Sequence, residues 1–244
     1  MKLRRLAETL KQLHWTKIGI DLVIVMVGVF LGMQASNWNA DREQDKKSVV
    51  FTSRLKADLR GEDWIYEFLT TYNREVLANA SRAVEALEGK TPLADEALLV
   101  AAYRATQYRQ SNRRRSTFDE LISTGNIGLI RDDKLRETAM RLYNVATFDN
   151  MVREGLQSRY REVFRMTLPN AVQRAVTRNC GDHVILPGDY AAIQGNLDYP
   201  CSTGLSAPDI ARSAQALRAN PDIVRFLRKS RLAAGMRELA PARG

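Results

Sequence analysis

The residues best suited to chemistry gather in one short stretch. His183 follows Asp182 and lies near Asp189 and Tyr190. An imidazole beside carboxylates could bind a metal ion or transfer a proton. However, no H-x-x-x-H or E-x-x-H spacing accompanies it, and turn-rich loops commonly use Asp and His for local hydrogen bonds. We therefore predict no catalytic, metal-binding or cofactor-binding residues here.

Cys180 and Cys201 are the only cysteines. An even number of cysteines in an oxidising compartment indicates one disulfide. The residues between them are rich in Gly, Pro and Asp, which predicts an irregular loop. A bridge that closes about 22 residues stabilises a fold by roughly 3 kcal/mol in the chain-entropy treatment. Two free thiols, or bonds between chains, are the alternatives. A redox-active pair usually has C-x-x-C spacing, which is absent.

The densest basic run is formed by Arg113, Arg114 and Arg115, with Arg104 and Arg109 upstream. Arginine forks bind phosphate and carboxylate groups bidentately. A run of charge is also commonly a solvated loop. We predict that residues 113–115 lie in an exposed connection and that any charge-dependent binding of an anion or an acidic partner uses them.

One stretch is apolar enough for a membrane. Residues 18–35 contain 13 apolar residues, and no charged residue occurs between Leu22 and Ala40. As a helix, the chain from Trp15 to Trp38 spans roughly 35 Å, and a bilayer core is about 30 Å thick. We predict a single transmembrane helix over residues 18–38.

A buried core helix and a cleaved signal peptide are the alternatives to this anchor. A signal peptide needs small residues one and three positions before the cut. A cut after Ala35 puts Met33 at the earlier position, and a cut after Ala40 puts Trp38 there. Neither position is small, so the sequence favours an uncleaved anchor.

The charges that flank the span predict its orientation. Residues 1–17 carry five basic residues against one acidic residue, and residues 36–45 carry three acidic residues against one basic residue. Because positive flanks stay in the cytoplasm, we predict a single-pass protein of the bacterial inner membrane. Residues 1–17 are then a cytoplasmic basic segment and residues 39–244 a periplasmic helical domain.

Two features within the span concern partners. Gly28 and Gly32 form a GxxxG pattern, which lets two membrane helices approach closely and predicts a homodimer through this face. The alternative is that glycine is simply common in membrane helices. Asp21 lies one turn after Lys17, where we expect an ion pair near the cytoplasmic interface instead of a proton relay.

The chain is basic, with a net charge of +9. Removal of the cytoplasmic segment and the span leaves +6 for residues 36–244. A basic domain in the cytoplasm would suggest nucleic acid as a partner, but the predicted topology argues against nucleic acid. The expected partners are the membrane and an envelope protein.

The exported region has helical periodicity. Small or apolar residues follow a 3.6-residue stripe from Phe51 to Leu87, and only Glu62 breaks it. Further helices are expected over 94–110, 116–124 and 132–168, followed by a further turn or two to Arg178. A short helix is expected after Pro208, and a final helix from Pro221 to about Leu239. We therefore predict an all-α fold: one transmembrane helix followed by an antiparallel helical bundle with a disulfide-closed loop.

Two segments resemble a family of uncharacterised bacterial single-span membrane proteins. The anchor ends in Gln34, Asn37, Trp38 and Asn39, which match the family's Gln-x-x-Asn-Trp-Asn-like motif. The stretch TFDELISTGNIGLIRDDKLR is similar to its second recurrent segment. The two segments cover about 45 of the 244 residues. The family has no established activity, so the resemblance implies an anchor and no catalytic residue.

These patterns favour a membrane-anchored helical module for sensing, scaffolding or partner binding, without catalysis. The alternative is an envelope enzyme that acts on cell-wall or lipid substrates through the loop of residues 179–201. An enzyme requires ionisable groups that converge in a cleft, whereas a scaffold does not.

Overall fold

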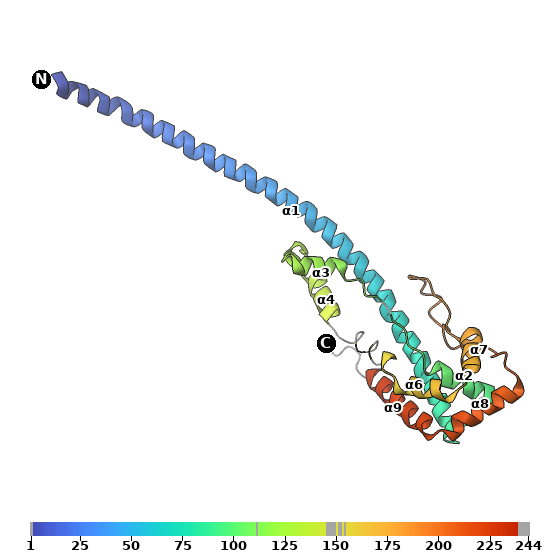
Figure 1. Cartoon of the computed structure of the whole chain (residues 1–244). Helices are drawn as coiled ribbons and strands as arrows, with labels where there is room; N and C mark the ends of the chain where they lie inside the picture. Colours follow the sequence, from blue (N-terminus) through green and yellow to red (C-terminus); the bar gives the residue numbers. More distant parts are fainter. Residues whose placement is uncertain (1, 111, 145–149, 151–152, 154, 239–244) are drawn as a thin grey trace. The chain divides into compact units, whose positions relative to one another are not determined.

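The computed structural model describes the whole chain except residues 1, 111, 145–149, 151–152, 154 and 239–244 (Figure 1). All regular secondary structure in the described residues is helical, which confirms the predicted all-α class. The chain forms two compact units. Unit 1 contains residues 1–56 and 117–138, and unit 2 contains residues 57–116 and 139–244. The region predicted as one exported domain therefore contributes to both units.

The first helix, α1 (Lys2–Leu87), is continuous over 86 residues. Its N-terminal part is long and apolar enough to cross a membrane, with a mean hydropathy of 2.1 over 18 residues. The large apolar side chains from Ile18 to Met33 are each 50–63% exposed. A helix in a soluble core would be buried, so this exposure disfavours the core-helix alternative.

Unit 1 joins α1 to a short helical corner. The corner contains α3 (Ser116–Ser123), the 3-10 helix η1 (Ile127–Leu129) and the start of α4 (Asp133–Asn144). Gly125 reverses the chain with φ +69°, a conformation that favours glycine. The Ser48 hydroxyl on α1 donates a hydrogen bond of 2.6 Å to the Leu129 carbonyl.

The apolar residues of this corner are divided between core and surface. Phe118, Leu121 and Ile130 are buried, whereas Ile122 on the same short helix as Phe118 is 47% exposed. The apolar face that α3 buries is therefore narrow.

Unit 2 is built on the second part of α1. Its other helices are α2 (Asp95–Arg104), α6 (Arg159–Thr167), α7 (Asn170–Cys180), α8 (Ala207–Ala219) and α9 (Pro221–Glu238). Helix α2 packs against α8, and α6 packs against α9 (Figure 1). Their shared core includes Leu98, Tyr160 and Leu217. The buried Tyr160 hydroxyl donates to the Ala102 carbonyl at 2.8 Å and so links α6 to α2.

Two of the predicted helices have other bounds in the structure. The single helix expected over 132–168 is wrong, because the described residues leave the helical conformation at Gln157 and Ser158, and α6 begins at Arg159. The Ser158 hydroxyl accepts a hydrogen bond from the Arg161 amide and caps α6. The helix expected over 94–110 ends at Arg104.

A second apolar cluster fixes the region that follows α7. Trp64, Phe68 and Tyr72 on α1 pack with Ile193 and Leu197 from the chain between α7 and α8. The Trp64 and Phe68 rings stack with centroids 5.3 Å apart. Through this cluster, the irregular segment between the two cysteines packs against α1.

Candidate functional site

A disulfide joins the two cysteines, as predicted. Cys180 is the last residue of α7, and its Cα lies 5.5 Å from that of Cys201. Cys180 is fully buried in the main core of unit 2. The bridge therefore fixes both ends of the segment of residues 181–200, which we call the bridged loop.

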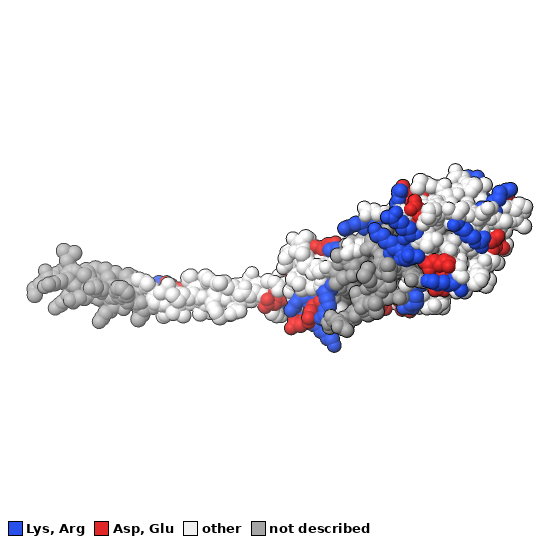
Figure 2. Space-filling model, turned by 90° about the horizontal axis from the view of Figure 1, so that it is seen from below, with Lys and Arg blue, Asp and Glu red and all other residues white. Residues whose placement is uncertain are grey.

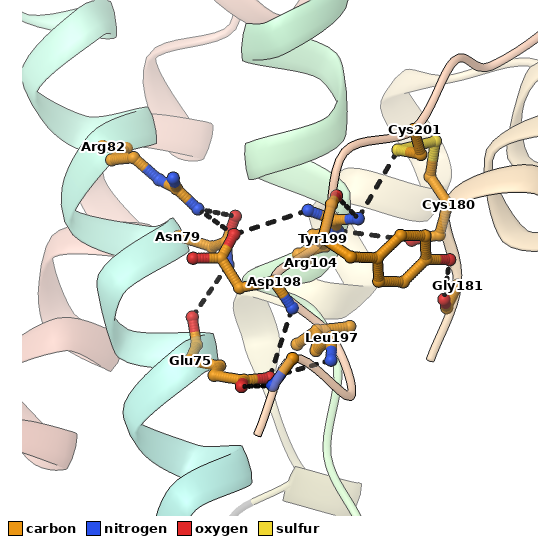
Figure 3. Close-up of polar contacts among 11 residues, drawn as sticks. Glu75, Asn79, Arg82, Arg104, Cys180, Gly181, Leu197, Asp198, Tyr199 and Cys201 are labelled. Atoms are coloured by element: carbon orange, nitrogen blue, oxygen red, sulfur yellow. Dashed lines mark hydrogen bonds and ion pairs between the residues drawn. A yellow bond between two sulfur atoms is a disulfide. The ribbon is translucent and has the colours of Figure 1, made fainter. Parts of the chain in front are cut away.

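Arg104, at the end of α2, binds both ends of the bridged loop (Figure 3). Its guanidinium donates to the Tyr199 carbonyl at 2.8 Å and to the Cys180 carbonyl at 3.3 Å. It also lies 4.7 Å from the centre of the Tyr199 ring and 3.5 Å from the Asp198 carboxylate. The side chain is only 4% exposed. Burial lowers the pKa of Arg104, and the Asp198 carboxylate opposes this shift.

Glu75 on α1 holds the bridged loop through its backbone (Figure 3). Its carboxylate accepts hydrogen bonds from the amides of Gly195 and Leu197, both at 2.8 Å, and of Asp198 at 3.2 Å. Gly195 has φ +71°, which allows the tight turn that aims these amides at one carboxylate. A charged acceptor makes stronger hydrogen bonds than a neutral one.

The residues first suspected of chemistry have structural partners. Asp182 lies 2.7 Å from the Arg109 guanidinium and accepts a hydrogen bond of 3.3 Å from the Tyr72 hydroxyl. The His183 ring stacks on Tyr199 with centroids 4.1 Å apart. Burial, and then the Asp182 carboxylate, raise the pKa of Tyr72. In the described part of the chain, no group of His, Cys, Asp and Glu side chains could hold a metal ion.

The outer side of the bridged loop is apolar and exposed. Val184 is 91% exposed and Leu186 is 72% exposed, whereas Ile185 between them packs against the α1 cluster. The backbone that precedes them is fixed, because the His183 carbonyl accepts hydrogen bonds from Arg109 and Asn196. The loop therefore presents two apolar side chains from an anchored backbone.

The basic surface predicted for residues 113–115 is partly buried in the structure. The side chain of Arg113 is only 10% exposed and lies 3.0 Å from the buried Glu62 carboxylate. That carboxylate also accepts a hydrogen bond from the Arg114 amide. The expectation that all of residues 113–115 are exposed is therefore wrong for Arg113, because this segment is fastened to α1. Arg114 is exposed and Arg115 is half-buried, and anion or partner binding by these residues stays a prediction.

The glycines of the predicted helix–helix contact are accessible. A Cβ atom added to Gly28 or Gly32 would meet nothing within 4 Å. Their surface is thus uncovered in a single chain, and dimerisation through it stays a prediction.

The structural roles of Glu75 and Arg104 were not predicted from the sequence, which suggested Arg104 only as part of the basic run. Glu75 and Arg104 lie in regular helical patterns, and their partners are 76 or more residues away along the chain. Glu62 could have been found from the sequence, since it is the one charged break in the apolar stripe. In the structure it is 1% exposed.

Comparisons of the chain with protein-family models, with curated proteins and with solved structures find no match. The resemblance of the anchor and of residues 117–136 to a family of single-span proteins therefore stays a prediction.

Proposed function

We propose that this chain is a single-span inner-membrane protein that binds an envelope protein through the outer side of the bridged loop. In this proposal it is a scaffolding or sensing module and catalyses no reaction. The observation that carries the proposal is the exposure of Val184 and Leu186 on a backbone that is fixed on its other side. Exposed apolar side chains on a fixed backbone lower the conformational cost of binding.

The ionisable residues of the bridged loop favour binding over catalysis. A catalytic acid or base must be available to a substrate. Here Asp182 and Asp198 are ion-paired with arginines, and the His183 ring is stacked on Tyr199. These groups are engaged in holding the loop, which supports a recognition role for its outer side.

The proposed orientation places the N-terminus in the cytoplasm. The basic flank of residues 1–17 supports it through the positive-inside rule. The disulfide supports it as well, because disulfides persist in oxidising compartments. A reporter that is active only after export, fused after Gly244, should be active. An intact but inactive fusion would contradict this orientation.

Chemical cross-linking in living cells, followed by mass spectrometry, tests the proposed function. The parent chain should capture an envelope protein that the V184D/L186D variant loses. The matched control is Met166→Asp, since Met166 is also an exposed apolar residue of unit 2. This control should capture the same protein as the parent. Equal capture by the parent and by V184D/L186D would contradict binding through the outer side of the loop.

A further inference from the structure

The buried and half-buried arginines of unit 2 differ in whether a carboxylate pairs with them. Three of them have a carboxylate within ion-pair distance. These pairs are Arg104 with Asp198, Arg109 with Asp182, and Arg113 with Glu62. Arg161 on α6 is half-buried, yet within the described residues no carboxylate or hydrogen-bond acceptor contacts its guanidinium. Because an arginine is rarely buried without a partner, Arg161 needs an explanation.

The surroundings of Arg161 are aromatic and basic. Its guanidinium lies 4.4 Å from the centre of the Tyr108 ring. The Tyr108 ring packs closely against Gly155, where an added Cβ would lie 2.6 Å from the tyrosine Cγ. Burial lowers the pKa of Arg161, and the charge of Arg165, one turn later on α6, lowers it further. The same helix face thus carries two cations, and one of them lies over the Tyr108 ring.

This arrangement is unfavourable for the free protein. Like charges one helical turn apart destabilise a helix, and burial adds a desolvation cost for Arg161. An oxyanion would offset both costs, because guanidinium groups form charge-assisted, bidentate hydrogen bonds with phosphate or carboxylate. Two uncompensated positive charges match a phosphate monoester, which carries close to two negative charges above a pKa of about 6.

The wider charge distribution agrees with this chemistry. Residues 139–244 carry 15 Lys and Arg against 9 Asp and Glu. In residues 57–116 the two signs balance, with nine of each. The excess charge of unit 2 therefore lies in the part that contains α6, and Figure 2 shows basic side chains gathered in several groups on the larger body.

We propose that Arg161 and Arg165 bind a phosphate dianion, with the Tyr108 ring as the surface that orients Arg161. The phosphate is either free in solution or the phosphomonoester headgroup of a lipid. This site is independent of the bridged loop and does not require the proposed protein partner.

The test uses the full chain in neutral detergent at pH 7.5. Inorganic phosphate should raise the midpoint of thermal unfolding in a saturable way, whereas chloride at equal ionic strength should not. Arg161→Gln should weaken phosphate binding at least tenfold, measured by calorimetric titration. Arg212→Gln is the matched control, since Arg212 is an exposed arginine of the same unit that already pairs with Asp209. This control should bind phosphate like the parent.

A second readout separates a binding residue from a structural one. In phosphate-free buffer, Arg161→Gln should unfold at the same temperature as the parent or higher, because it removes a charge without a counter-charge. A lower midpoint would mean that Arg161 serves packing, and would overturn the proposal. Arg165→Gln, at an exposed position, should keep the fold and weaken phosphate binding at least threefold.

Short-chain phosphatidic acid added to the neutral micelles identifies the source of the phosphate. Stabilisation by phosphatidic acid at lower concentration than by inorganic phosphate indicates a lipid headgroup, and the reverse indicates free phosphate. Phosphatidylcholine, which has no net charge, should not stabilise the chain. The proposal is overturned if neither phosphate source stabilises the parent, or if Arg161→Gln and Arg165→Gln respond like the parent.

Discussion

The bridged loop has two sides that use their residues in opposite ways. On the inner side, Ile193 and Leu197 are buried against α1, and backbone amides reach the Glu75 carboxylate. On the outer side, Val184 and Leu186 contact solvent over most of their surface. Exposed loops usually carry small and polar residues. Long-range polar contacts therefore fix this loop, while its apolar outer side stays exposed.

Residues 113–115 and the pair Arg161 and Arg165 are two basic regions that differ in how their charge is paired. The segment of residues 113–115 has the highest density of arginine, yet Arg113 is bound to the buried Glu62. Arg161 stands in an ordinary helix sequence, yet it has no carboxylate partner among the described residues. Whether an arginine is available to a ligand therefore depends on its ion pairs in the folded chain and not on how many arginines lie near it in the sequence.

The largest expected effect follows from the loss of Arg104 on the inner side. Arg104→Met should destabilise unit 2 by about 3–5 kcal/mol, because it leaves the Cys180 and Tyr199 carbonyls without their side-chain donor, at about 1–3 kcal/mol each, and removes one of the two arginines that pair with Asp198. Urea unfolding followed by circular dichroism measures this change. Arg212→Met, which breaks an exposed pair, should cost under about 1 kcal/mol. Similar losses in the two variants would mean that Arg104 does not organise the loop.

Opening the disulfide should give the next largest effect. Cys180→Ser combined with Cys201→Ser should lower the free energy of unfolding by roughly 3 kcal/mol, since the unfolded chain regains the freedom of the closed segment. Unfolding curves of the parent with and without reductant provide a second measurement of the same quantity. Thiol labelling of the unreduced, denatured parent should find no free sulfur. Two labelled thiols would contradict the bridge.

Loss of the Glu75 charge should have a smaller effect. Glu75→Gln keeps the size of the side chain but weakens the acceptor for three amides, so we expect a cost of about 1–3 kcal/mol. Hydrogen exchange at Gly195 and Leu197 should accelerate more than exchange in α8. The matched control is Glu67→Gln at an exposed position of the same helix. Equal acceleration throughout unit 2 would show global destabilisation instead of local loosening.

The smallest expected effect is a pH dependence of stability at Glu96, which binds Thr203 just after the bridged loop. Hydrogen bonds from the Thr203 hydroxyl and amide lower the pKa of Glu96. Its stabilising contribution is thus fully present above the pKa of an unfolded glutamate, about 4.3, and is lost as the pH falls through the lower folded value. Thermal unfolding between pH 6 and pH 3 should show a smaller acid-induced loss in Glu96→Gln than in the parent. Equal slopes would contradict this contribution.

The sequence predicted the parts of this molecule that depend on local chemistry. The apolar span predicted a helix over 18–38 and the apolar stripe predicted one up to Leu87, both of which lie in α1, and composition together with cysteine count predicted the bridged loop. The break at Ser158 was missed because charged and apolar residues on either side continue a helical spacing. The anchoring of the loop was also missed, because Glu75 and the amides it binds are about 120 residues apart.

Photo-cross-linking from single positions of the bridged loop in living cells tests whether its outer side binds an envelope protein. A photoreactive residue is placed at position 184, 185 or 186 of the full chain, and at 166 as a control. Positions 184 and 186 should cross-link to one envelope protein, whereas 185, which faces α1, and 166 should not. Equal cross-linking from 184, 185 and 166, or none from 184 and 186, would contradict recognition through the outer side.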